Sequence, residues 1–501
     1  MRAALRRGAA LQTCLLHHGV EEALPAAAAP MVGSAAAAAA ANGGSWPCRL
    51  QQQQPFSAAA RSADTPQAEV GQHFVIASST PVTKRLWQRF HWTMEKLLAA
   101  PPRDPASQLP KPPRPISITY PFSTDELLRE HYRSPWEEVR IGRILEDLDS
   151  LAGYVAFDHS EMEGETTRPP LCVTASVETI ELYSSSLNLR EDMKLTGRVV
   201  WTGSSSMDIQ IDLEQAGERQ LTALFTFVAR DVLTNKAHPI TPLAPRTKPD
   251  QERFCERQRA AQQRGAARQA AAGGSSGGGS GGIGGGPGGQ LHRALHSLRP
   301  EAERWAEQLL ATAKNKQDLP ALVAPNTLLM SEASHSNIFV CQPQNRNVHG
   351  RVFGGFLMRR AFELAHATTY LFAGCRPLAA EVEEVTFKRP VNVGDLIKFK
   401  SQVLHTWVSP DQPDQGMAYV QVQASVTQPE KRQSVTTNTF DFIFKYALEM
   451  DEQGAPLPPK MVLPATEQQA LEVARVFGPG AERQHQHNPA LARLLELEAS
   501  R

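Results

Sequence analysis

An internal repeat constrains the fold of this chain more than any other feature of its sequence. Residues 177–200 read VETIELYSSSLNLREDMKLTGRVV, and residues 382–404 read VEEVTFKRPVNVGDLIKFKSQVL. Each segment is a β-rich run, a turn that carries Leu-Asn-Leu or Val-Asn-Val, and a second β-rich run. A segment that occurs twice in one chain indicates two folded units of the same kind.

Both repeats continue into strands that alternate apolar and polar residues. The runs are MDIQIDL from Met207 and AYVQVQASV from Ala418, and then LTALFTFVARD from Leu221 and TTNTFDFIFKY from Thr436. Alternation with a period of two is typical of half-buried antiparallel strands. The strand-rich part of each unit therefore predicts one antiparallel sheet.

One long helical pattern precedes the strands in each unit. Apolar residues recur at helical spacing over residues 141–155, and less cleanly over residues 354–374. The second pattern is apolar nearly all round, which predicts a deeply buried helix. A buried helix wrapped by an antiparallel sheet is an α+β plan, and two such units packed together would cover each other's sheet edges.

Low-complexity sequence divides the chain into parts. We expect a disordered leader over residues 1–65, a first unit with an N-terminal extension over 70–240, and a second unit over 293–465 that begins with a helix near 293–314. The stretch 245–292 contains GGSSGGGSGGIGGGPGG and reads as a flexible linker, with residues 250–290 disordered. Residues 466–501 read as a C-terminal tail.

The leader also has the composition of a targeting sequence. Arg2, Arg6 and Arg7 lie among alanines and leucines, and the first acidic residue is Glu21. A basic, acid-poor, Ala-rich leader is typical of an organelle transit peptide, and we expect a mitochondrial location, with the plastid as the alternative. A disordered low-complexity tail without a targeting role is the other interpretation.

Composition excludes several classes of function. Lysine plus arginine equals aspartate plus glutamate, 52 each, which argues against a nucleic-acid partner held by bulk charge. No apolar run reaches the length of about eighteen residues that a membrane span needs. Six scattered cysteines without a CxxC pair favour a reducing compartment, and no metal or other cofactor is expected.

Several formal motif matches fall in the Gly-rich linker. Residues 273–277 and 278–282 match G-x-S-x-G, and Gly284, Gly286 and Gly289 match G-x-G-x-x-G. None lies between a strand and a helix, which the nucleophile elbow and the dinucleotide fingerprint both require. We read them as accidents of composition.

The informative motif opens the helical pattern of the second unit. Residues 347–358 read NVHGRVFGGFLM, which resembles the N-x-x-G-x-x-x-G-G signature of the double-hotdog acyl-coenzyme A thioesterases. Residues 136–153, WEEVRIGRILEDLDSLAG, resemble the equivalent helix of the first repeat, with Gly142 at the place of Gly355. The resemblance covers residues 70–465 apart from the linker. It implies two tandem hotdog domains, each a long central helix wrapped by an antiparallel sheet.

The resemblance also implies a catalytic pair. In such thioesterases an Asn before the helix of one repeat works with a carboxylate in the helix of the other, seven residues after the second Gly. These positions are Asn347 and Asp149 here. The mirror positions hold Ser134 and Phe362, with Glu363 one residue late, so the second site is expected to be inactive.

The residues themselves support Asp149 in part. It lies at the edge of the apolar stripe of its helix, whereas Glu146 and Asp147 are expected to point further away. A carboxylate beside a buried face is one whose pKa can be tuned for base chemistry, although a surface acid in a charged helix is the plain alternative. Asn347 is equally suited to a turn or a helix N-cap.

The remaining site residues follow from the resemblance and from the chemistry of coenzyme A (CoA). Gly354 and Gly355 would let a substrate approach the backbone, and their amides would bind the thioester oxygen as it becomes an oxyanion. Asp149 would activate water or attack to form an anhydride. His349 is expected to be structural or to contact substrate. The cations nearest the site, Arg351, Lys388 and Arg389, are candidates for the phosphates of CoA.

The expected activity is hydrolysis of acyl-CoA to a free fatty acid and CoA, with the acyl chain length undetermined. Two alternatives stay open: an acyl-CoA-binding or sensing protein without turnover, and a hotdog dehydratase or hydratase. The latter generally needs a catalytic His beside a carboxylate, and no His occupies the matching helix entry. The resemblance also implies a homo-oligomer, commonly a trimer of two-domain units.

Overall fold

The computed structural model describes residues 80, 82, 99–101, 109–161, 167–168, 170–184, 186–273, 299–347, 350–383, 385–481 and 483. The predicted leader, the Gly-rich stretch 274–298, His349 and most of the predicted tail lie outside these residues. The described part contains no helix long and apolar enough to cross a membrane.

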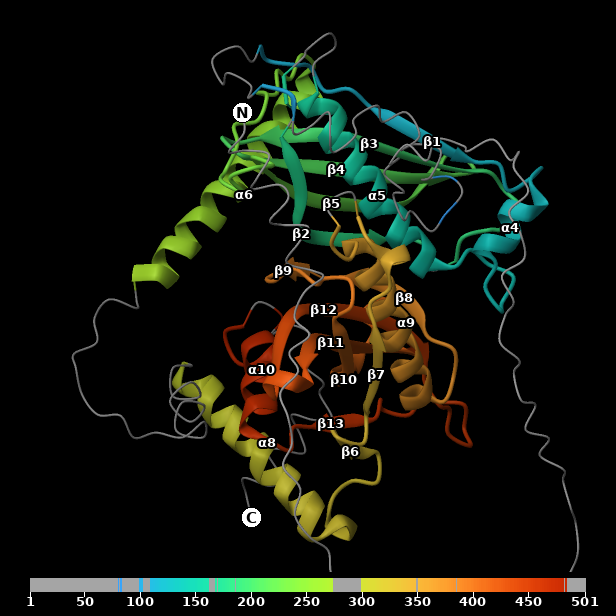
Figure 1. Cartoon of the computed structure of the whole chain (residues 1–501). Coiled ribbons are helices and arrows are strands. Elements are labelled where there is room, and N and C mark those ends of the chain that lie inside the picture. The colour runs from blue at the N-terminus through green and yellow to red at the C-terminus, as the bar shows by residue number, and fades with distance from the viewer. Residues whose placement is uncertain are drawn as a thin grey trace, which may run out of the picture. The chain divides into compact units, whose positions relative to one another are not determined.

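The first repeat contains the predicted helix followed by antiparallel strands (Figure 1). Its elements are β1 (Ile116–Tyr120), α4 (Glu126–Tyr132), α5 (Ile141–Ser160), β2 (Leu171–Leu182), β3 (Met193–Thr202), β4 (Ser206–Gln215), β5 (Glu218–Arg230) and α6 (Lys248–Gly273). Helix α5 and strands β4 and β5 coincide with the segments that the hydrophobic periodicity predicts.

The second repeat has the same order of helix and strands, with additional elements at both ends. Its elements are α8 (Pro300–Asp318), β6 (Thr327–Leu329), β7 (Ser334–Val340), α9 (Gly354–Ala373), β8 (Leu378–Val382), β9 (Val385–Phe387), β10 (Leu396–Val408), β11 (Gln415–Gln428), β12 (Gln433–Ala447), β13 (Met461–Leu463) and α10 (Glu467–Phe477). Short 3-10 turns occupy Pro320–Leu322, Pro343–Asn345 and Pro429–Lys431. Helix α9 ends where Gly374 adopts a φ of 75°, a conformation that glycine tolerates without strain.

The strands of both repeats form one sheet. Its eleven strands run in the order β1-β3-β4-β5-β2-β8-β12-β11-β10-β7, with β9 pairing both β12 and β2. The junction is antiparallel: Ile180 of β2 faces Val382 of β8, and Val177 faces Val385 of β9. The join covers one edge of each half-sheet, which leaves β1 and β7 as the ends of the sheet. The α+β class that the sequence predicts is confirmed.

Helices α5 and α9 lie against the sheet and against each other. They run antiparallel, because Gly142 lies beside Glu363 at one end of the contact while Asp149 lies beside Gly355 at the other. Glu146 and Arg359 occupy equivalent positions in the two repeats and pair at 3.1 Å in the middle of this contact. Behind α9, Phe362 packs on Phe442 and Phe444 of β12, with ring centroids 5.7 and 5.6 Å apart.

The predicted disorder of residues 250–290 is wrong for its first part. Helix α6 extends to Gly273 and packs on β3. Arg257 of α6 donates to Asp208 of β4 at 3.0 Å and pairs with Glu178 of β2, and Arg264 binds the same two acids. The Asp208 side chain is fully buried. These ion pairs hold the helix on strands that are distant in sequence, which composition alone does not reveal.

The predicted C-terminal tail also begins with packed structure. Helix α10 is capped by Thr466, whose hydroxyl accepts from the amide of Gln469, and it buries an apolar face. Phe477 lies 4.3 Å from the ring of His405 on β10 and 5.2 Å from the ring of Tyr419 on β11. The second folded unit thus extends beyond residue 465.

Candidate active site

Asp149 lies in α5 at the point where this helix meets the start of α9. Its side chain is 2% exposed. One carboxylate oxygen, Oδ2, accepts from the backbone amide of Gly355 at 2.6 Å, and Oδ1 accepts from the hydroxyl of Thr174 at 2.9 Å. The predicted acid of the first repeat is therefore in direct contact with the predicted Gly-Gly turn of the second.

Burial raises the pKa of Asp149 to about 6, although the hydrogen bonds from Thr174 and Gly355 act in the opposite direction. Burial disfavours the charged form of a carboxyl group, and donors favour it. The carboxylate is thus ionised at neutral pH and more basic than an ordinary aspartate. This balance suits a group that accepts a proton from water.

Glycine is required at positions 354 and 355 because α5 and Phe387 approach the backbone there closely. A Cβ at Gly355 would lie 3.0 Å from Cβ of Asp149 and 3.0 Å from the carbonyl oxygen of Glu146. A Cβ at Gly354 would lie 3.1 Å from Oδ2 of Asp149 and 3.1 Å from Cζ of Phe387. The two glycines let the helix start touch the carboxylate. The Gly355 amide donates to Asp149, so in this structure it positions the acid.

Thr174 is a site residue that sequence reasoning missed. It lies on β2, and its hydroxyl donates to Asp149. Alternation along β2 predicts which side of the strand faces a helix, but β-bulges beside Ser176 and Thr179 break the simple period of two. The available signal was a hydroxyl residue in a helix-facing strand, which is common and not specific.

Asn347 closes the turn before α9. Its side-chain Oδ1 accepts from the amide of Arg351 at 3.1 Å, and its own amide donates to the Arg351 carbonyl at 2.6 Å. Its carbonyl accepts from the amide of Gly350, whose φ of 76° falls in the left-handed region. The turn role of Asn347 is therefore present. Its catalytic role stays a prediction, and so does that of His349, which lies outside the described residues.

Glu146 and Asp147 differ from their predicted exposure, since both are buried. Asp147 is fully buried and accepts from Thr80 at 2.5 Å, from Tyr120 at 3.0 Å and from Tyr132. Burial raises the pKa of Asp147 to about 7. These partners lie outside α5, which explains why the helical pattern of α5 alone did not predict the burial of Asp147.

The mirror position has a different structure. Phe362 is 7% exposed and belongs to the aromatic core. Glu363 lies beside Gly142, but its carboxylate is bound by Arg140 and, at 3.3 Å, by Arg360. The Ser134 hydroxyl accepts from the amides of Trp136 and Glu138 at 3.3 and 3.2 Å. The Glu363 carboxylate is thus engaged by two arginines, whereas the Asp149 carboxylate is bound by two neutral donors.

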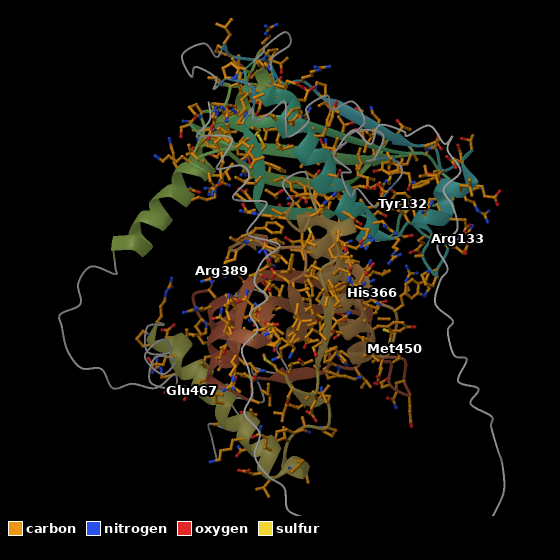
Figure 2. The ribbon with its side chains drawn as sticks, in the orientation of Figure 1. Tyr132, Arg133, His366, Arg389, Met450 and Glu467 are labelled. Carbon is orange, nitrogen blue, oxygen red and sulfur yellow. The ribbon has the colours of Figure 1, made fainter. Side chains whose placement is uncertain are left out.

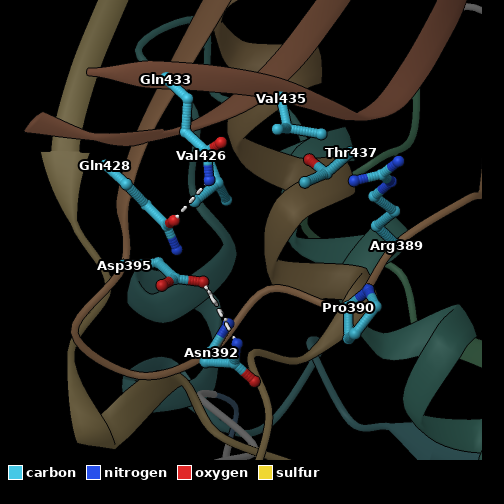
Figure 3. A pocket seen from close by; sticks show the side chains of 9 residues that line it. All are labelled: Arg389, Pro390, Asn392, Asp395, Val426, Gln428, Gln433, Val435 and Thr437. Carbon is cyan, nitrogen blue, oxygen red and sulfur yellow. Dashed lines mark hydrogen bonds between the residues drawn. The ribbon is translucent and has the colours of Figure 1, made fainter. Parts of the chain in front are cut away.

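The candidate phosphate-binding cations are exposed, and one of them, Arg389, lines a pocket. This pocket, of about 170 Å³, is lined by Arg389, Pro390, Asn392, Asp395, Val426, Gln428, Gln433, Val435 and Thr437. Figure 3 shows Arg389 pointing toward the side where Thr437 lies, and Asn392 bonded to Asp395 below. The backbones of Arg351 and Asn392 form an isolated β-bridge, which connects the turn of Asn347 to a residue that lines the pocket. Lys388 precedes Arg389 and does not line the pocket.

His366, labelled with Arg389 in Figure 2, is on α9 and packs against the rings of Trp136, Tyr370 and Phe444. Burial lowers the pKa of His366. Among the described residues no group of three or more His, Cys, Asp or Glu side chains could hold a metal ion.

Comparison with known proteins identifies the family. No protein-family model matches the chain. The chain is 40% identical over 408 residues to acyl-coenzyme A thioesterase 2, chloroplastic, of Humulus lupulus, which covers 79% of this chain and 87% of the relative. It is 39% identical to the mitochondrial acyl-coenzyme A thioesterase 4 of the same plant, over 82% of this chain and 75% of the relative.

An animal relative is similar over nearly the same region. Acyl-coenzyme A thioesterase 9, mitochondrial, of Homo sapiens is 31% identical over 351 residues, covering 68% of this chain and 72% of the relative. The plant and animal matches confirm the resemblance carried by the NVHGRVFGGFLM and EDLDSLAG segments. The chain therefore belongs to the acyl-coenzyme A thioesterase family.

Proposed function

We propose that the chain hydrolyses acyl-CoA to a free carboxylic acid and CoA at one site built from both repeats. Family membership supports the reaction. The observation that carries the site is the bond between Asp149 of the first repeat and the Gly355 amide at the start of α9 in the second. A buried carboxylate, a helix start and glycines that allow close approach are the parts that thioester hydrolysis needs.

In the general-base route, Asp149 takes a proton from water, and the resulting hydroxide attacks the thioester carbon. The carbonyl oxygen becomes an oxyanion next to the start of α9, where the Gly354 amide and the helix dipole favour negative charge. Collapse breaks the carbon–sulfur bond, and the departing CoA thiolate takes up the proton. Thr174 and Gly355 hold the carboxylate in place, and Asn347 orients the water or the carbonyl.

In the nucleophilic route, Asp149 attacks the thioester carbon itself. A mixed anhydride forms, CoA leaves, and water then hydrolyses the anhydride to regenerate the carboxylate. The two routes use the same residues and differ in one covalent intermediate. Mass spectrometry of acid-quenched enzyme separates them, because only the second route adds the acyl mass to the chain.

The repeats fit a tandem arrangement of two hotdog domains. In this proposal α5 and α9 are the central helices, and the eleven-stranded sheet is formed by the two domain sheets joined edge to edge. The first domain occupies residues 70–240 and the second starts at 293 and includes α10.

The ends of the joint sheet, β1 and β7, give a physical reason for assembly into a homo-oligomer, for which we propose a trimer of two-domain units. Light scattering at micromolar protein concentration tests the oligomeric state, and a monomer would count against the trimer.

The leader and the relatives together favour an organelle. The relatives named above are mitochondrial or chloroplastic by name. We propose that residues 1–65 direct the chain to the mitochondrion, with the plastid as the alternative. A fusion of these residues to a fluorescent protein would separate the two by its location.

One assay separates the proposed activity from its competitors. Purified chain is incubated with acyl-CoAs from short to long chains, and released CoA is followed with a thiol reagent. Hydrolysis releases one thiol for each acid. A protein that only binds acyl-CoA releases none, and a hydratase changes the acyl group without freeing the thiol. The chain-length panel also gives the substrate preference.

A further inference from the structure

Asn438 on β12 is a buried amide with no hydrogen-bond partner among the described residues. It is 0% exposed, and neither Nδ2 nor Oδ1 is bonded. An unsatisfied polar group in a protein interior is destabilising, so natural proteins seldom retain one without a use. An asparagine at such a position therefore requires an explanation.

The sheet register places Asn438 beside the reaction site. Its Cα partner on β9 is Phe387, and residues paired across strands project to the same face. Phe387 is the residue whose ring lies 3.1 Å from the position of a Cβ at Gly354. Phe440, two residues further along β12, packs edge-on against Phe387 with ring centroids 6.5 Å apart. Asn438 thus lies on the helix-facing side, one strand away from the residue that covers the start of α9.

The neighbouring residue connects Asn438 to the pocket of Figure 3. Thr437 lines that pocket together with Arg389, and a β-bulge between Ala424 and Ser425 of β11 leaves Thr437 as the extra residue of β12. Asn438 therefore lies between two regions: the pocket that Arg389 lines on one side, and Gly354 with Asp149 on the other.

The first repeat lacks this amide. Val177 pairs with Phe225 as Val382 pairs with Phe442, so the sheet register places Leu221 at the position of Asn438. Leu221 is fully buried. Two sheets of the same plan therefore differ here by one polar side chain. This asymmetry matches a chain in which one of two related sites works.

We propose that Asn438 binds an amide of the pantetheine arm of CoA, which rests on the proposed function for the identity of the substrate. An asparagine side chain offers a donor and an acceptor together. A secondary amide offers the complementary acceptor and donor, and the pantetheine arm carries two of them. A thioester carbonyl would satisfy only Nδ2. The arm also has to span from the phosphates to the thioester, which is the interval where Asn438 lies.

The test compares stability with substrate use. We expect Asn438→Ala and Asn438→Leu to lower kcat/KM for acyl-CoA by about tenfold, mainly through KM, because two neutral hydrogen bonds are lost. The Tm should stay level or rise, since an unpaired buried amide has been removed. Thr327→Val is the matched control: Thr327 of β6 is fully buried, and its hydroxyl has no partner among the described residues. Its kcat/KM should be unchanged.

A substrate series locates the contact. With an S-ethyl thioester of the same acid, which has no pantetheine amide, parent and Asn438 variants should react equally. Equal losses on both thioesters would overturn the proposal, because Asn438 would then act on the chemistry or the site shape. A fall in Tm without a change in kcat/KM would also overturn it, and would indicate a structural role through buried water.

Binding keeps the assignment testable if hydrolysis itself is absent. Calorimetry compares CoA with adenosine 3′,5′-bisphosphate, which keeps the nucleotide phosphates but lacks the arm. The contact is supported if the Asn438 variants bind CoA more weakly than the parent but bind the bisphosphate equally well. Equal binding of CoA in parent and variants refutes it. A parent that binds CoA through Asn438 without releasing thiol from acyl-CoA would disprove the proposed hydrolysis only.

Discussion

Replacing Asp149 by asparagine should make the protein more stable and nearly inactive. Asparagine keeps the size of the side chain and can accept from the Gly355 amide, but it cannot take a proton from water. Turnover of acyl-CoA should therefore fall by at least about a hundredfold, the lower range for loss of a general base. In the parent, kcat/KM should rise with pH through about 6 and then level off, because Asp149 must be ionised.

The stability gain follows from the burial of Asp149. Its pKa rises from 3.8 to about 6 on folding, so the folded state binds a proton that the unfolded state has released. Between these values the free energy of unfolding of the parent falls as pH rises, and above about 6 the loss is complete. At 1.36 kcal/mol per tenfold change in acid strength, the full loss is about 3 kcal/mol. The asparagine of the Asp149→Asn variant cannot ionise, so the free energy of unfolding of the variant does not fall in this way as pH rises.

Chemical denaturation at a series of pH values measures this difference. The variant and the parent should be similar near pH 4, and the variant should gain up to about 3 kcal/mol by pH 8. Asp147 also titrates in this range, with its pKa at about 7, but it is present in both proteins and cancels in the comparison. A stability difference that does not grow with pH would refute the burial argument, and full activity of the variant would refute the catalytic one.

Four further outcomes follow from the structure. Asn347→Ala should lower turnover by about a hundredfold, and combining it with Asp149→Asn should cost little more than the worse single change, because both serve one step. Ser134→Ala, at the mirror position, should leave steady-state turnover within a few-fold of the parent. Deleting residues 274–289 should change neither Tm nor activity, whereas Arg257→Met should lower Tm because the buried Asp208 loses its closest cation.

The main elements of the fold could be predicted because their signals are local. Alternation in β4, β5, β11 and β12 and the helical pattern of α5 lie within single segments, and each coincides with the observed element. The repeat then predicted two helix-and-sheet units. Helix α6 could not be predicted in this way, since its arginines bind acids of β2 and β4 that are far away in sequence.

The same distinction holds at the site. The resemblance named Asp149 and the Gly-Gly pair as parts of one site, but it assigned the Gly355 amide to the thioester oxygen and not to Asp149, to which it donates here. The burial of Asp147 depends on Thr80, Tyr120 and Tyr132, which no pattern within α5 reveals. Thr174 and Asn438 likewise acquire their places from strand pairing. Side chains whose partners come from other elements are those that sequence periodicity leaves undetermined.

The central claim is that the working acid lies in the first repeat. It is tested most directly by acyl-CoA hydrolysis, followed with a thiol reagent, in Asp149→Asn and Glu363→Gln proteins shown to be folded. The account predicts that Asp149→Asn loses nearly all activity. Glu363→Gln should keep it, because Glu363 is engaged by Arg140 and Arg360. Full activity of Asp149→Asn together with an inactive Glu363→Gln would contradict the account and move the working acid to the second repeat.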